Sequence, residues 1–170
     1  MYAKAVRGFT LIELLVVIAI MGFLFSIALA ALSTAQRDAR DKRRVDDLKQ
    51  LQNALNLYDN DHNMLPRESD GANGNVTTNS VLRAMLKPYI SAMPTDPAGA
   101  GNSTFYYYYD GNHNCGGKYY AVIFARQMDK PENANYDAFF NTTCTATLDG
   151  EGRGGGTESY NIIVGLSADY

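Results

Sequence analysis

The sequence predicts an α+β protein in which a long N-terminal helix packs on a small antiparallel β-sheet head. The first half of this helix is expected to be transmembrane and the second half amphipathic. Three observations predict this class. An apolar run at residues 9–32 is long enough to cross a bilayer as a helix. A segment with helical periodicity and no Gly or Pro follows it, and runs rich in tyrosine and β-branched residues come later in the chain.

The apolar run has three polar residues, Thr10, Glu13 and Ser26, and no charge follows Glu13 until Arg37. Its apolar positions occur all round the helix, which favours a membrane span over an amphipathic surface helix. A carboxylate one turn inside such a span is energetically costly. We therefore take Glu13 as a functional residue.

The residues that lead into the run read K-A-V-R-G-F-T-L-I-E, from Lys4 to Glu13. This motif closely resembles the class III leader of type IV pilins and the related pseudopilins. The resemblance implies that a prepilin peptidase cuts between Gly8 and Phe9 and methylates the new Phe9 amine. It also implies that Glu13 pairs with the N-terminal amine of a neighbouring subunit during assembly. The physics agrees, because an ionised carboxylate in an apolar fibre core needs a counter-charge.

An ordinary secretory signal is the alternative interpretation of the same run, with cleavage after the A-L-A sequence that ends at Ala30. The carboxylate of Glu13 and the length of the run both argue against this signal. The chain would then be an exported binding protein, released after Ala30.

The orientation of the span presents a conflict. Five basic residues follow the span and two precede it, so the positive-inside rule alone would place the C-terminus in the cytoplasm. We give the leader motif precedence because it is more specific and because acidic residues interleave with the basic run.

The span is expected to continue into an amphipathic helix, giving one rod from about Thr10 to Asn60 and ~75 Å long. Its core face is predicted to carry Val45, Leu48, Leu51, Leu55 and Tyr58, at helical spacing. Leu57 lies on the opposite side and is predicted to pack against a neighbouring subunit. The i,i+4 ion pairs expected along the helix are Arg37–Asp41, Asp38–Lys42 and Arg43–Asp47.

The rest of the chain reads as a small sheet with long connections. A loop follows the helix, and Ser80 is predicted to cap a short helix that Pro88 ends. Three strands are expected, within residues 103–110, 118–128 and 159–166. The predicted division is a leader at 1–8, the transmembrane and polymerisation helix at 9–34, the amphipathic helix at 35–61 and the β-sheet head at 62–170.

Two cysteines, Cys115 and Cys144, lie in the part that the resemblance places outside the membrane, where a disulfide can persist. Metal ligation or a nucleophile beside His113 is the alternative, but there is no C-x-x-C pair and no second histidine cluster. A structural disulfide between the two cysteines is therefore predicted.

The C-terminal loop contains three carboxylates, Asp149, Glu151 and Glu158, which are oxygen ligands of the kind that calcium takes. Some pseudopilins bind calcium in this loop. Because no binding motif surrounds the three residues here, no metal and no other cofactor is predicted, and calcium stays an alternative.

The main functional prediction is a structural subunit of a type IV pilus-like filament, serving twitching motility, adhesion or DNA uptake. The alternative within the family is a pseudopilin of a type II secretion or competence system. Expected partners are further copies of the chain, the prepilin peptidase and an inner-membrane assembly platform. The subunit would span the membrane once before assembly and lie in an extracellular or envelope filament afterwards. No residue set argues for an enzyme, and the net charge of -3 gives no sign of nucleic-acid binding.

Overall fold

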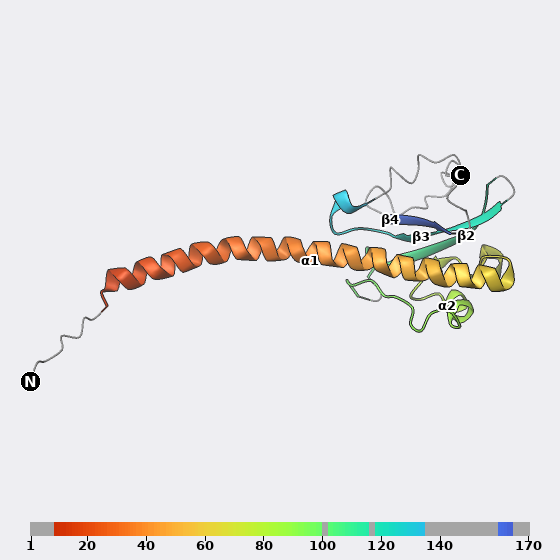
Figure 1. Ribbon diagram of the computed structural model, residues 1–170, viewed down its shortest axis with the longest axis horizontal. Helices are drawn as coiled ribbons and strands as arrows, with labels where there is room; N and C mark the ends of the chain where they lie inside the picture. The colour runs from red at the N-terminus through yellow and green to blue at the C-terminus, as the bar shows by residue number, and fades with distance from the viewer. Residues whose placement is uncertain (1–8, 100–101, 116–117, 135–159, 165–170) are drawn as a thin grey trace, which may run out of the picture. The chain divides into compact units, whose positions relative to one another are not determined.

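Helix α1 (Leu11–His62) is the longest element of the chain and contributes to both of its compact units, 1–37 and 38–170 (Figure 1). The computed structural model describes residues 9–99, 102–115, 118–134 and 160–164. The bounds of α1 lie within two residues of the helix expected from the sequence. The chain therefore has the predicted α+β class, with a long N-terminal helix and a small antiparallel sheet.

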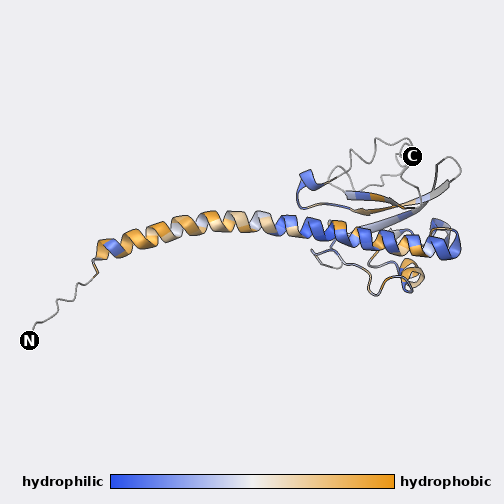
Figure 2. Ribbon diagram, viewed as in Figure 1, coloured by the Kyte–Doolittle hydropathy of each residue, from blue (hydrophilic) through white to orange (hydrophobic). Residues whose placement is uncertain are grey.

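The first unit is the apolar half of α1, whose side chains are exposed among the described residues (Figure 2). Its large apolar side chains are exposed by between 42% at Val17 and 88% at Leu11. Among the described residues, α1 is the one helix long and apolar enough to cross a membrane. Apolar surface on this scale needs lipid or a protein neighbour around it.

The second unit contains a four-stranded antiparallel sheet in the order β1-β2-β3-β4. The strands are β1 (Gly74–Asn75), β2 (Tyr107–Cys115), β3 (Lys118–Ala125) and β4 (Tyr160–Val164). The last three overlap the predicted strands. β1 falls in a stretch expected to be loop, because two residues are too few to show strand periodicity. The short 3-10 helices η1 (Glu68–Asp70) and η2 (Pro131–Asn133) lie in the connections.

The hairpin between β2 and β3 differs from the expectation of a loop at 111–117. β2 continues to Cys115 and β3 begins at Lys118, with a register shift between Asp110 and His113. Gly111 lies at this shift, and a Cβ atom there would clash with the carbonyl oxygen of Pro66. Backbone pairing carries the strand through polar residues of low strand propensity.

The core lies between the second half of α1 and the sheet, with α2 (Ser80–Leu86) closing it (Figure 1). The predicted face of α1 is confirmed, because Leu48, Leu51 and Leu55 are buried in this core. The other buried members from the helix and the strands include Leu82, Leu86, Tyr107, Tyr109, Ala121, Ile123, Ala125 and Val164.

The cap of α2 is Asn79, where the sequence had favoured Ser80. The side-chain oxygen of Asn79 accepts a hydrogen bond from the Leu82 backbone N–H at 2.9 Å. Its amide nitrogen donates to the carbonyl oxygens of Gly71, Ala72 and Asn73 at 2.9–3.0 Å. A serine hydroxyl has one donor and could not hold this turn in the same way.

Candidate functional site

The carboxylate of Glu13 lies in the first turn of α1 and forms a capping box with Thr10. Glu13 Oε2 accepts hydrogen bonds from the Thr10 backbone N–H at 2.8 Å and from the Thr10 hydroxyl at 2.7 Å. The Glu13 backbone N–H donates in turn to Thr10 Oγ1 at 3.3 Å. A Thr and a Glu three residues apart satisfy N-terminal N–H groups of a helix reciprocally in this way. The sequence pattern T-x-x-E could have predicted the role of Thr10, which sequence reasoning missed.

The capping box holds the negative charge of Glu13 at the N-terminal end of α1. This end carries the positive end of the helix dipole and the unpaired N–H groups of the first turn. Phe9 precedes the box and its side chain is 83% exposed. Glu13 is therefore one helical turn from the residue whose amine the predicted cleavage would create.

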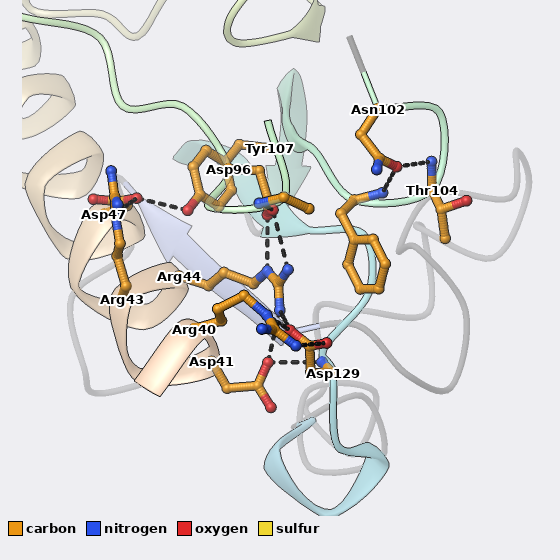
Figure 3. A network of polar contacts seen from close by, with 12 residues as sticks. Arg40, Asp41, Arg43, Arg44, Asp47, Asp96, Asn102, Thr104, Tyr107 and Asp129 are labelled. Carbon is orange, nitrogen blue, oxygen red and sulfur yellow. Dashed lines mark hydrogen bonds and ion pairs between the residues drawn. The ribbon is translucent and has the colours of Figure 1, made fainter. Parts of the chain in front are cut away.

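The head has a second charged site, the buried guanidinium of Arg44 (Figure 3). Its Nε and Nη2 atoms donate to the two carboxylate oxygens of Asp96 at 2.8 and 3.0 Å. Its Nη1 atom donates to Asp41 at 2.8 Å and to Asp129 at 2.7 Å. The Phe105 ring lies against the guanidinium, with its centroid 4.5 Å from Cζ. Arg44 thus joins α1 to the turn at 96 and to the loop after β3.

The loop after β3 is bound to α1 by several further contacts. Arg40 donates two hydrogen bonds of 2.8 Å to the Asp129 carboxylate. Asp41 accepts hydrogen bonds from the backbone N–H groups of Asp129 and Lys130, at 2.7 and 3.0 Å, and from the Asn133 amide at 2.8 Å. The Lys130 ammonium pairs with Asp38 at 2.8 Å. Side chains of one helical stretch therefore fix the loop that contains η2.

These contacts shift the pKa values of the groups involved. Hydrogen bonds from Arg40, and then the guanidinium of Arg44, lower the pKa of Asp129 to about 2. Burial opposes the charged form of Arg44, but hydrogen bonds and charges of Asp96 and Asp129 outweigh burial and raise its pKa. Burial raises the pKa of Asp47, although a 2.6 Å hydrogen bond from the Tyr107 hydroxyl acts the other way. The Arg44 guanidinium thus has its opposite charges within the head itself, which suits a structural role.

The ion pairs expected along α1 are present only in part. Arg43 and Asp47 approach to 3.8 Å, as predicted. Asp41 instead pairs with Arg44, which lies three residues further along the same helix. Asp38 pairs with Lys130, which the loop after β3 brings to it. Arg44 lies four residues before Leu48 on the core face, and a charge on that face was the available signal for the network.

Several predicted site residues fall outside the described part of the chain. These are Gly8, Cys144, Asp149, Glu151 and Glu158, and the side chain of Cys115 at the end of β2 is likewise outside it. The cleavage site, the disulfide and the calcium alternative stay predictions. Among the described residues, no three His, Cys, Asp or Glu side chains are placed to hold a metal ion.

Comparison with known proteins gives two family matches. Residues 3–29 match the prokaryotic N-terminal methylation motif, and residues 31–137 match the type II secretion system protein G family. No solved structure matches the chain.

Three curated relatives are each named type II secretion system core protein G. That of Klebsiella michiganensis is 36% identical over 103 residues, which cover 58% of this chain and 72% of the relative. That of Pectobacterium carotovorum is 35% identical over 97 residues, or 55% of this chain and 62% of the relative. That of Escherichia coli K12 is 35% identical over 97 residues, which cover 55% of this chain and 67% of the relative. The chain thus covers less than two thirds of the Pectobacterium relative.

Replacing Arg44 with methionine should destabilise the head by about 3–5 kcal/mol, because it leaves buried carboxylates without their counter-charge. Arg43→Met is the matched control, since Arg43 is 61% exposed and its one ion pair is 3.8 Å long. The control should change the free energy of unfolding by less than about 0.5 kcal/mol. Urea unfolding of the full chain in detergent measures both values, and equal values for the two variants would contradict a structural role for Arg44.

The stabilisation from Asp129 should depend on pH. Its pKa is about 2 in the folded chain against an ordinary 3.8, so the folded state favours the ionised carboxylate. This contribution, up to roughly 2 kcal/mol, is complete above pH ~5 and is lost as the pH falls towards ~2. The difference in unfolding free energy between the wild type and Asp129→Asn should therefore shrink over that range. A difference that stays constant between neutral pH and about pH 3 would refute the assignment.

Proposed function

Because the chain belongs to the type II secretion system protein G family, we propose that it is a structural subunit of a secretion pseudopilus. The observation that carries this proposal is the apolar half of α1. Its side chains are exposed among the described residues, and its first turn holds one carboxylate. Lipid would surround this half before assembly, and neighbouring copies would surround it in the filament. The match to the N-terminal methylation motif supports the prepilin leader over the secretory signal with cleavage after Ala30.

Within the family, the relatives support the pseudopilin alternative better than the type IV pilus subunit that was the main prediction. The family is structural, which agrees with the expectation that the chain is not an enzyme. Twitching motility and adhesion belong to the pilus prediction and are not part of this proposal.

The proposed assembly begins with cleavage between Gly8 and Phe9 by the prepilin peptidase and methylation of the Phe9 amine. Before assembly, residues 9–34 anchor the subunit in the inner membrane, and the head lies outside the cytoplasm. The assembly platform then extracts it into the filament, where water is excluded from the helix bundle. An ionised Glu13 must find a cation there, and the Phe9 amine of a neighbour supplies one. This pairing would fix the axial offset between subunits.

The charge of Glu13, beyond its capping role, should be required for assembly. Glu13→Gln keeps a side chain that can accept the Thr10 hydrogen bonds but removes the charge, whereas Glu13→Val removes both. Both variants should insert and be cleaved yet form few or no filaments. Ser26→Val, a polar-to-apolar change in the same span, is the control and should assemble normally.

The measurement is electron microscopy of filaments produced with the secretion machinery, together with the mass of the membrane-bound subunit. Normal filaments from Glu13→Gln would show that capping is sufficient and that no charge pair sets the register. Filaments of normal number from Glu13→Val would exclude any role for Glu13 in assembly.

We also retain the prediction that Cys115 and Cys144 form a disulfide. In the chain-entropy model, closing a loop of this length stabilises the fold by ~3–4 kcal/mol, less any strain. A thiol reagent should label neither cysteine in protein denatured without reductant, and both after reduction. Two reactive thiols before reduction would refute the bond and restore metal ligation as the alternative.

A further inference from the structure

After Asp46 and Lys49, the exposed side of the last turns of α1 carries a stripe without charge. The stripe consists of Gln50, Asn53, Asn56, Leu57 and Asn60, all of them exposed. Their spacing places them on one side of the helix, opposite the face that Leu51 and Leu55 bury. Protein interfaces are depleted of charge at their centre, and a half-exposed leucine among neutral amides fits that pattern.

The polar members of the stripe have unused hydrogen-bonding groups. Within the described part of the chain, the amides of Gln50, Asn53, Asn56 and Asn60 make no side-chain hydrogen bond. The helix next to them is acidic, because Asp59 and Asp61 follow while Lys and Arg are missing from residues 50–66. A complementary surface should therefore offer donors, positive charge and a small apolar hollow for Leu57.

A surface of this kind lies on and after α2. A shallow hollow of about 440 Å³ has Ala84, Ile90 and Met93 among its apolar lining and Arg83 and Lys87 among its polar lining. No acidic side chain lines it. The Arg83 guanidinium donates a hydrogen bond to the Thr77 carbonyl oxygen at 3.2 Å, and Lys87 is exposed. The hollow thus combines apolar contact area with two cations.

We propose that the α1 stripe of one copy docks into the α2 hollow of a second copy, with Leu57 at the centre of the contact. This contact rests on the proposed filament function, and it would join the heads of neighbouring subunits. Two different surfaces of one chain that fit each other make a head-to-tail contact, and such contacts generate open helical filaments. Asp61, an exposed residue one turn after Leu57, and the two cations of the hollow give the contact its charge complementarity.

The direct test is a photo-crosslink from position 57 in the full chain, assembled with its secretion machinery. Leu57 is replaced by p-benzoylphenylalanine, and Glu68, an exposed residue of η1, carries the same probe as the control. Irradiated filaments should yield covalent dimers from position 57 and not from position 68. Mass spectrometry should place the adduct within residues 80–93 of the second copy. Filaments without this adduct, or with an adduct elsewhere, overturn the inference and leave the proposed function standing.

Paired substitutions in α2 give an independent measurement. Ala84→Leu fills the hollow, whereas Val81→Leu enlarges another exposed apolar residue of α2 that does not line it. Ala84→Leu and Leu57→Ser should each reduce filament yield by roughly fivefold or more, with an unchanged unfolding midpoint, and Val81→Leu should not. Normal yields from both Ala84→Leu and Leu57→Ser refute the contact. Lack of filaments from the unmodified chain would instead refute the proposed function, and this inference with it.

Discussion

The buried charge of Arg44 is the constraint on which the head depends. Removing a guanidinium from water is costly unless its fork is fully hydrogen-bonded to opposite charge. Here the three carboxylates come from α1, from the turn at Asp96 and from the loop at Asp129, 52 and 85 residues along the chain from Arg44. A packing that separated these segments would take from Arg44 the carboxylates that it binds in the folded head. The apolar core drives collapse, and Arg44 selects one arrangement of the collapsed segments.

The same network bears on the conflict between the basic run and the expected orientation. Of the five cations that follow the span, Arg40 and Arg44 are paired with carboxylates of the folded head. The Arg43 guanidinium has Asp47 at 3.8 Å. The folded chain thus carries a much smaller positive excess on the head side of the span than its sequence suggests. The positive-inside rule counts Lys and Arg and gives acidic residues little weight, so the specificity of the leader motif remains the reason for the expected orientation.

The features that the sequence predicts well are those that depend on a pattern within a single helix or strand. The apolar span, the core face through Leu48, Leu51 and Leu55, and the tyrosine-rich strands all follow from periodicity or length. The partners of Arg44 could not be predicted, because pairing across 52 or 85 residues leaves no local pattern. β1 is too short to be periodic. The cap of α2 depended on three carbonyl groups that only the folded turn brings to Asn79.

Arg44 and Glu13 show two different ways of accommodating a charge away from water. Arg44 is neutralised by acidic residues of its own chain, so its burial specifies the fold. The hydrogen bonds of the Glu13 carboxylate within the described residues all involve Thr10, which supplies dipoles and no positive charge. Local dipoles are enough to stabilise the ionised carboxylate while water still reaches it. They are not enough in a bundle of helices from which water is excluded. In the proposed filament, the Phe9 amine of a neighbouring subunit would supply the counter-charge, and the burial of Glu13 would then specify the assembly.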